Sequence, residues 1–295
     1  MHKILKSVAT VTLSCTVIAG AASCAKKQTQ DITLTSFNIR TYTKEELDCN
    51  NWENRKDAVM AYISGMKTDV ICLQEVKQSQ YEDLVEGLDE RLGIVYYVRE
   101  IRNNAEGLAI VYDKTVWEKI EENRFWLSPT PEIETKGWDA SHYRICVNVL
   151  LEHKQTSARL NVFNVHLDVK SALAREKGIE LVLERAKKSD APVFVCGDFN
   201  CKSTDTPYEK ASAVLQDCQA VAPDSDNGVT FQDWGKKADD AGTPIDFCFA
   251  DKKKIQPLSF AILRDKWGET NENYYADHYA VQTKVRLEYK TKKGS

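Results

Sequence analysis

Six side chains of types that bind metal ions or transfer protons stand beside short apolar runs of this chain: Glu75, His166, Asp198, Asn200, Asp277 and His278. Carboxylate and amide oxygens are hard ligands that suit Mg²⁺, Mn²⁺ or Ca²⁺. Imidazole can take up or release a proton near neutral pH. One hard cation and two imidazoles would stabilise the charge that develops when water attacks a phosphoester. These residue types are compatible with metal-assisted attack of water on a phosphoester.

Each motif taken alone has a plainer interpretation. Glu75 fits a solvated loop carboxylate, and Asp277 with His278 fits the cap of a helix or strand. The segment 198–200 fits an Asx turn, because Asp and Asn both favour turns. Gly197 allows tight backbone geometry under either interpretation. Spacing alone leaves these alternatives open.

The histidines narrow the choice of metal. Four occur beyond the first 23 residues, and His166 and His278 each lie close to an aspartate beside an apolar run. His142 and His153 fall in expected loops, where an exposed imidazole needs no special role. No third histidine and no cysteine pair has the spacing of a zinc site. The candidate site therefore suits an oxygen-liganded cation better than zinc.

Strands and helices must position these side chains. Helical spacing of apolar residues predicts helices at Trp52–Met66 and Ser171–Lys188, the second with Ser171 as its N-cap. No repeat or Pro/Ser-rich linker divides residues 31–290, so we expect a single α/β domain with sheets inside and helices outside. Apolar runs predict eight strands: Ile32–Ile39, Asp69–Leu73, Gly107–Tyr112, Ile145–Leu151, Leu160–Val165, Val193–Cys196, Ile245–Ala250 and Tyr279–Leu287.

Polar residues stand at many ends of these predicted strands. Asn38 and Glu75 fall at the ends of the first two, His166 and Asp168 follow another, and Asp246 opens a late one. The segment 197–200 and the pair 277–278 hold similar positions. Strand ends in open α/β folds commonly share one rim, where ligands bind. We therefore expect these side chains to converge.

The order of the motifs resembles that of a known family. The motifs are Thr35-Ser36-Phe37-Asn38-Ile39-Arg40, Leu73-Gln74-Glu75-Val76, Asn164-Val165-His166-Leu167-Asp168, Gly197-Asp198-Phe199-Asn200, Ile245-Asp246-Phe247 and Ala276-Asp277-His278-Tyr279. Together they closely resemble the endonuclease/exonuclease/phosphatase superfamily, which includes DNase I, over residues 31–288. The resemblance implies a four-layered α/β sandwich, with two packed mixed β-sheets flanked by helices.

The resemblance also implies roles for individual residues. Asn38, Glu75 and Asp277 would hold the metal, Mg²⁺ by expectation and Mn²⁺ or Ca²⁺ as alternatives. The roles in catalysis would fall on Asp198 and Asn200 against the phosphate and the nucleophile, on His278 oriented by Asp246, and on His166 oriented by Glu106. Arg144 matches a position from which family members contact the substrate phosphate.

Three further residues have open interpretations. Phe125 fits simple packing in the segment 124–131, whereas Trp138 in a polar loop fits the mouth of a substrate pocket. Asp168 is characteristic of a bacterial branch of the superfamily that has no assigned substrate. Both a metal-side carboxylate and a structural cap remain open for Asp168.

The N-terminus predicts export. Lys3 and Lys6 precede a short apolar run and small residues up to Ser23, as in a secretory signal peptide. The sequence Ala21-Ala22-Ser23-Cys24 loosely resembles a lipobox, which favours acylation of Cys24 and attachment to the membrane surface. Cleavage near Ala21 without acylation is the alternative. We expect residues 24–30 to form a tether, residues 31–288 the domain and residues 289–295 a disordered tail.

Charge and cysteine content limit the partners. Residues 1–23 hold two lysines and no acid, so the rest of the chain has 38 basic and 44 acidic side chains and a net charge of −6. This charge disfavours a dedicated DNA-binding protein. Buried packing roles are expected for four cysteines in apolar runs, although Cys196 and Cys201 fit a disulfide in an oxidising compartment. The buried set is Cys72, Cys146, Cys196 and Cys248.

Three functions follow from the sequence. The first is an exported hydrolase of phosphodiesters or phosphomonoesters, acting on a small molecule, a lipid headgroup or a nucleic acid. The second is a secreted nuclease, which a basic stripe beside the pocket would favour. The third is a catalytically silent binding module with the same fold, which the presence of Glu75, Asp198, Asp277 and His278 disfavours. No obligate protein partner is indicated.

Overall fold

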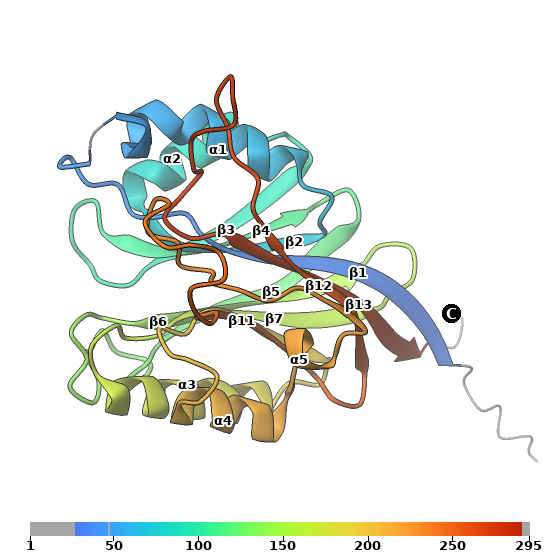
Figure 1. Ribbon diagram of the computed structural model, residues 1–295. Coiled ribbons are helices and arrows are strands. Elements are labelled where there is room, and N and C mark those ends of the chain that lie inside the picture. Colours follow the sequence, from blue (N-terminus) through green and yellow to red (C-terminus); the bar gives the residue numbers. More distant parts are fainter. Residues whose placement is uncertain (1–26, 47, 291–295) are drawn as a thin grey trace, which may run out of the picture.

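Two β-sheets pack face to face between two layers of helices (Figure 1). The structure is a computed structural model that describes residues 27–46 and 48–290. The predicted four-layered α/β sandwich with two mixed sheets is confirmed. Since two stacked sheets expose two outer faces, helices are needed on both sides to cover them.

The first sheet has seven strands in the order β10-β12-β13-β1-β2-β4-β3. Its strands β1, β2 and β13 bring Asn38, Glu75 and the segment before Ala280 to one rim. The strand bounds are β1 (Lys27–Asn38), β2 (Val70–Lys77), β3 (Leu92–Val98), β4 (Glu106–Asp113), β10 (Asp224–Ser225), β12 (Ile255–Leu263) and β13 (Ala280–Lys290).

The second sheet has six strands in the order β5-β6-β7-β8-β11-β9. Its central strands β7, β8 and β11 carry the other half of the predicted site. The strand bounds are β5 (Trp117–Trp126), β6 (Ile145–His153), β7 (Arg159–His166), β8 (Val193–Asp198), β9 (Gln216–Asp217) and β11 (Asp246–Ala250).

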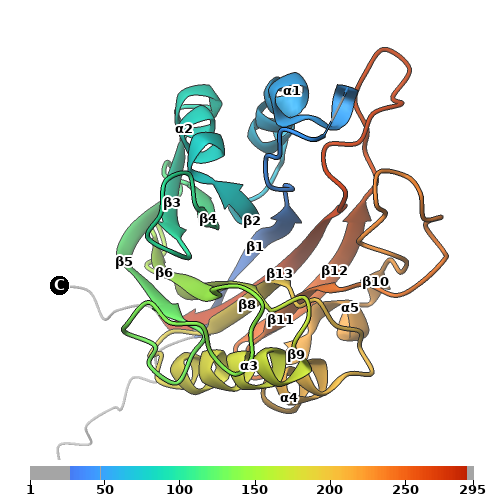
Figure 2. The same cartoon turned by 90° about the vertical axis from the view of Figure 1, so that its left-hand side faces the viewer.

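Helices α1 (Trp52–Gly65) and α2 (Gln78–Gly87) cover the outer face of the first sheet, whereas α3 (Ala172–Ala186) and α4 (Thr206–Val214) cover that of the second (Figure 2). The short helices η1 (Asp48–Asn50) and α5 (Cys218–Val221) complete the described elements. The Ser171 side chain accepts a hydrogen bond from the backbone N–H of Ala174, which confirms the predicted N-cap of α3.

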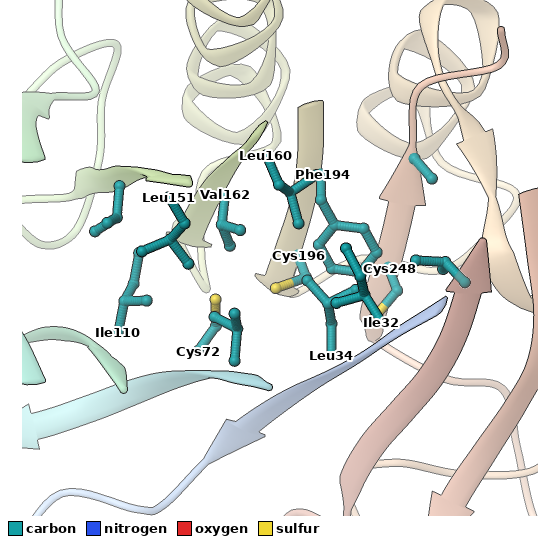
Figure 3. Close-up of a cluster of buried hydrophobic side chains, with 14 of the residues drawn as sticks. Ile32, Leu34, Cys72, Ile110, Leu151, Leu160, Val162, Phe194, Cys196 and Cys248 are labelled. Carbon is teal, nitrogen blue, oxygen red and sulfur yellow. The ribbon is translucent and has the colours of Figure 1, made fainter. Parts of the chain in front are cut away.

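Three apolar clusters hold the four layers together. The central cluster fills the space between the sheets with Leu34, Leu160 and Phe194, among others (Figure 3). A second cluster joins α3 to the second sheet, and a third joins α1 to the first. Phe125 is buried in the second cluster, so its packing interpretation is confirmed.

The cysteines also belong to these clusters. Cys72, Cys196 and Cys248 lie in the central cluster, where Figure 3 shows them among aliphatic side chains, and Cys146 lies in the cluster beneath α3. The predicted burial of all four is confirmed. Every cysteine of the described segments is a free thiol, so Cys196 and Cys201 do not form the disulfide left open by the sequence.

Both ends of the predicted domain need correction. The tether was expected to reach residue 30 and the tail to begin at 289, yet β1 starts at Lys27 and pairs with β13 as far as Lys290. These strand ends are polar and are held by backbone hydrogen bonds between the antiparallel strands β1 and β13 rather than by burial of apolar side chains. The predicted signal peptide, the acylated Cys24 and residues 291–295 lie outside the described residues. Within them, no helix is both long and apolar enough to cross a bilayer.

Candidate active site

Three neighbouring strands place three predicted site residues in one row. His166 of β7 lies opposite Asp198 of β8 in the parallel register, and Asp198 lies opposite Asp246 of β11 in the antiparallel register. All three side chains are buried. Since directly opposed residues on a sheet have Cβ atoms only about 5 Å apart, sheet pairing itself brings this acid–imidazole set together.

Asn38 joins this row to the first sheet. Its Nδ2 group donates to Oε1 of Glu75 and to Oδ2 of Asp198, both at 3.1 Å. Its Oδ1 atom accepts a hydrogen bond from the backbone N–H of Arg40. One fully buried amide therefore fixes a carboxylate from each sheet, and the predicted convergence of the strand ends is observed.

The backbone is constrained at the same positions. Arg40, Glu75 and Asn200 have φ values of 60°, 60° and 48°, in the left-handed region that non-glycine residues rarely adopt. Glu75 lies where a bulge interrupts the register between β2 and β4. Gly197 has φ 145°, and a Cβ atom there would lie 1.8 Å from the carbonyl oxygen of Val165. Strained backbone of this kind concentrates at functional sites.

His278 is oriented as the resemblance implied. Its Nδ1 lies 2.9 Å from Oδ2 of Asp246, and its Nε2 lies 3.8 Å from Oδ2 of Asp198. Burial alone would lower the pKa of His278, but the charge and hydrogen bond of Asp246, together with Asp198, raise it to about 10. The geometry favours an imidazole that donates from both nitrogens.

The pKa values of Asp198 and His166 are shifted so that burial favours their neutral forms, in contrast to His278. Burial and then the charge of Asp246 raise the pKa of Asp198 to about 7. Burial and then the nearby arginines, Arg144 and Arg99, hold the pKa of His166 well below its ordinary value. His166 Nε2 lies 3.5 Å from Oδ2 of Asp198. Buried neighbours with shifts in opposite directions are typical of acid–base sites.

Glu75 and Asp277, the carboxylates predicted to hold a metal, lie on one side of the site around Arg40. The guanidinium of Arg40 lies 3.8 Å from Oε2 of Glu75 and 3.7 Å from Oδ2 of Asp277, so both carboxylates face one shared cation. Oδ1 of Asp277 is buried and has no hydrogen-bond partner among the described residues. A hard divalent cation fits this pair of carboxylates, with the amide of Asn38 beside them.

A second group of potential metal ligands is more closely packed than Glu75 and Asp277. The potential ligand atoms of Asp198, Asp246 and His278 lie within 4.8 Å of one another. The 2.9 Å contact between His278 Nδ1 and Asp246 occupies that ring nitrogen, however. Each group has one buried carboxylate oxygen without a partner among the described residues, Oδ1 of Asp277 and Oδ1 of Asp246. The pair Glu75 and Asp277 offers hard oxygen ligands alone, which suits a hard cation better.

The predicted partnership of Glu106 with His166 is wrong. Glu106 accepts a short hydrogen bond from Nη1 of Arg99, and Nδ1 of His166 has no hydrogen-bond partner within the described ranges. Arg99 begins the loop that joins β3 to β4 and lies beside Glu106, as the backbone hydrogen bond from Arg99 N–H to the Glu106 carbonyl shows. The arginine, rather than the histidine, satisfies this carboxylate.

Asp168 is a structural cap. Its carboxylate accepts hydrogen bonds from the backbone N–H groups of Ser141, His142, Lys170 and Ser171 and from the Ser141 hydroxyl. Burial would raise the pKa of Asp168, but these donors lower it to about 2. Of the two interpretations that the sequence left open for Asp168, the structure supports the structural cap. Its carboxylate ties the loop before β6 to the start of α3.

The site opens into a cavity of about 360 Å³. The lining residues are Arg40, Thr41, Glu75, Arg99, Glu106, His142, Arg144, His166, Val169, Asp198, Asn200, Phe231, Ile245, Asp277 and His278. Asn38 and Asp246 support this lining from behind through the hydrogen bonds described above. Arg144, for which the resemblance implied contact with substrate phosphate, lies in the cavity wall.

One predicted lining residue is misplaced, and several were missed. Trp138 is not among the described residues that line the cavity. Its loop has positive φ at Trp138 and Asp139, and the Ser171 hydroxyl donates a hydrogen bond to the Trp138 carbonyl. Arg40, Arg99 and Phe231 were missed. Arg40 belongs to the first quoted motif, whereas no local signal marks the other two.

The match to known proteins agrees with this geometry. The model of the endonuclease/exonuclease/phosphatase family matches residues 35–278, from the strand before Asn38 to His278. The chain belongs to this family. Its members are phosphoester hydrolases that are generally dependent on a divalent metal ion, and the residues found here fit such an ion.

Solved structures share the whole fold. A family member from Bacteroides thetaiotaomicron has a TM-score of 0.82 at 24% identity, over 89% of this chain and 97% of that one. The mannosyl-6-phosphatase of Bacteroides thetaiotaomicron has a TM-score of 0.79 at 25% identity, over 86% of this chain and 99% of that one.

Among relatives by sequence, the 3'-5'-exoribonuclease subunit Ccr4 of Aspergillus niger is 23% identical over 65% of this chain and 38% of its own length.

Proposed function

We propose that this chain is an exported, metal-dependent phosphoester hydrolase that directs a water molecule at phosphorus. The observation that carries the proposal is the Asn38 bridge, which holds a metal-side carboxylate and the Asp198 carboxylate against one cavity. Membership of a family of phosphoester hydrolases supports the same reaction. The catalytically silent alternative would require this arrangement to persist without use.

Glu75 and Asp277 would hold the metal, with Asn38 orienting Glu75. When bound, a Mg²⁺ ion, or Mn²⁺ or Ca²⁺ in its place, would supply positive charge against the phosphate and the leaving oxygen. Arg40, ion-paired with both carboxylates and with Glu46, would hold them in place. The carboxylates thus stay fixed without having to reorganise during the reaction.

The other wall of the cavity would handle protons. Asp198 faces both imidazoles and accepts from the backbone N–H of Asn200, so it is placed to orient the attacking water and take its proton. His278, locked by Asp246, would donate from Nε2 to a phosphate oxygen. His166 would donate to a second non-bridging or leaving oxygen, and the Asn200 side chain anchors the turn by donating to the Leu167 carbonyl.

The substrate we favour is a small molecule. A cavity of about 360 Å³ lies at the small end of the range for ligand pockets. The likeness to a mannosyl-6-phosphatase supports this choice. The nuclease alternative is supported by the likeness to Ccr4, whereas a net charge of −6 beyond residue 23 opposes it. Phosphate-bearing lipid headgroups are also phosphoesters and belong with the small-molecule substrates.

Export is part of the proposal. The basic and apolar start of the chain and the Ala21-Ala22-Ser23-Cys24 sequence support a cell-envelope lipoprotein, with simple secretion as the alternative. The substrate would then be met outside the cytoplasm. Globomycin-sensitive processing and labelling of the expressed protein with a palmitate analogue would test the anchor, and a Cys24→Ser variant should lose the label.

A substrate screen tests the reaction. The purified protein is assayed with Mg²⁺ and with EDTA against sugar phosphates, nucleotides, DNA, phosphoinositides and sphingomyelin, with His278→Ala as the inactive control. We expect EDTA-sensitive hydrolysis of at least one phosphoester. Absence of hydrolysis throughout the panel, by protein that binds Mg²⁺, would support a binding module instead.

A further inference from the structure

Two arginines in the wall of the cavity have donors without acceptors. Arg99 and Arg144 are 8% and 6% exposed, and both line the cavity. Nε of each is buried and has no hydrogen-bond partner within residues 27–46 and 48–290. Because an unpaired buried donor is unfavourable, two such arginines in the wall of one cavity fit a site where a ligand supplies acceptors to their guanidinium groups.

The carboxylates near the two guanidinium groups are partly engaged with other donors. Glu106 pairs with Arg99, and Glu100, which also pairs with Arg102, lies 3.8 Å from Nε of Arg99. Asp168 lies 3.8 Å from Nε of Arg144, but backbone and hydroxyl donors already occupy its oxygens. Burial, and after it the charges around Arg144, hold the pKa of Arg144 below its usual range. The two arginines therefore form a cationic subsite, here called the Arg99/Arg144 subsite.

This subsite is adjacent to the proton-handling wall. Both arginines depress the pKa of His166, and Nδ1 of His166 also has no hydrogen-bond partner among the described residues. A phosphate that receives a proton or hydrogen bond from His166 would thus have one further face against the arginines. Guanidinium groups bind phosphate oxygens through paired, charge-assisted hydrogen bonds.

The number of phosphate oxygens then selects the substrate. A phosphodiester has two non-bridging oxygens, which the metal side and the two imidazoles would occupy. A phosphomonoester has a third, and its second ionisation near pH 6 gives it close to two negative charges at neutral pH. A diester would place its second ester arm against the buried arginines and leave their donors unpaired. Sites that hydrogen-bond one substrate reject an analogue lacking the group.

We propose that the Arg99/Arg144 subsite binds the third oxygen of a terminal phosphate and makes phosphomonoesters the substrates, with Arg99 as a specificity-determining residue. The choice of monoester rests on the hydrolase function proposed above. The phosphate-binding role of the subsite does not, because it requires only the cavity and the two arginines. These two parts can be tested separately.

The kinetic test compares p-nitrophenyl phosphate with bis(p-nitrophenyl) phosphate, which share a leaving group. The wild type should prefer the monoester. Arg99→Ala should lower kcat/KM for the monoester at least about tenfold, the scale of a charge-assisted hydrogen bond, and lower that for the diester distinctly less. Arg99→Lys keeps the positive charge but loses the planar guanidinium, so its kcat/KM for the monoester should lie between those of the wild type and Arg99→Ala. Arg102→Ala, an exposed neighbour, is the matched control.

The binding test uses inorganic phosphate and protein kept metal-free with EDTA, measured by calorimetry. Phosphate should bind the wild type and the Arg102 variant, and at least about tenfold more weakly to the Arg99 variants, whose melting temperatures confirm folding. Arg99-dependent phosphate binding supports the subsite even where no ester is hydrolysed, in which case only the hydrolase proposal fails. Equal losses for both esters, a preference for the diester, or phosphate binding indifferent to Arg99 would overturn the inference.

Discussion

At the scale of single residues, His278 has the contacts that a proton-handling group needs. Asp246 fixes its Nδ1, and Asp198 lies opposite its Nε2 at 3.8 Å. His278→Ala should therefore lower kcat at least about a hundredfold, the usual range for acid–base groups. Because Glu75 and Asp277 remain, metal binding should persist. Steady-state kinetics and Mg²⁺ titration of the variant check both points, and near-normal turnover would remove His278 from the mechanism.

The residue types and order of the motifs were enough to predict most of the site. Asn38, Glu75, Asp198, Asp246 and His278 lie where the strand ends predicted, because sheet pairing places adjacent strand ends on one rim. The residues that sequence reasoning missed depend on contacts that no local pattern encodes.

Arg99 is the clearest case. Arg99 lines the cavity from the start of the loop between β3 and β4, and it pairs with Glu106, the partner expected for His166. The prediction for Trp138 also failed in a loop, one with positive φ at Trp138 and Asp139.

At the scale of elements, β7 and β8 approach so closely that only glycine fits at position 197. A Cβ atom there would meet the Val165 carbonyl oxygen at 1.8 Å, and the φ of 145° disfavours any other residue. Gly197→Ala should lower the free energy of unfolding by at least about 2 kcal/mol and reduce kcat, because Asp198 is the next residue.

Urea denaturation measures this loss of stability. Gly65→Ala is the matched control, since a Cβ atom at that helical position meets nothing within 4 Å. It should be neutral or slightly stabilising. Equal stabilities for the two variants would contradict the close approach of β7 and β8.

Asp168 acts between elements, where it caps α3 and the loop before β6. Asp168→Asn should lower the free energy of unfolding by about 2 kcal/mol at pH 7, because charge-assisted hydrogen bonds are lost. The pKa of Asp168 in the folded protein, about 2, lies below its unfolded value. Its contribution is therefore complete above about pH 4 and declines as the pH falls toward 2.

The difference in unfolding free energy between wild type and Asp168→Asn, measured in urea at several pH values, should shrink across that interval. A difference that stays constant from pH 7 to pH 3 would assign the loss to the amide's shape rather than to the lost charge.

The strands were less predictable than the site they carry. Strand β5 is largely charged and exposed between Trp117 and Trp126, and β3 is only half-buried, so neither has the apolar pattern that marks a buried strand. Both form because β4 and β6 offer them free edges to pair with. Edge strands of this kind are determined by tertiary pairing rather than by local sequence.

At the scale of the whole molecule, metal binding should be coupled to folding. Glu75 lies on β2 and Asp277 just before β13, so the two meet only in the folded chain. An ion that binds the folded state alone stabilises it in proportion to the logarithm of its concentration. The melting temperature should rise with added Mg²⁺ and fall back with EDTA.

Glu75→Gln should abolish most of this rise, while His278→Ala should keep it. Differential scanning calorimetry at several Mg²⁺ concentrations distinguishes the two variants. A rise that survives Glu75→Gln unchanged would place the ion elsewhere, for example at the group of Asp198, Asp246 and His278.

The length of β1 fixes how the catalytic rim would be presented to a membrane. The strand runs 12 residues from Lys27 to Asn38, a rise of roughly 36 Å. Were Cys24 acylated, only two residues would separate the lipid from Lys27, and the rim at Asn38 would stand at the opposite end of the strand. The cavity would then face away from its own bilayer, toward solutes arriving from outside. Such an orientation favours diffusible phosphates over the headgroups of the membrane that carries the enzyme.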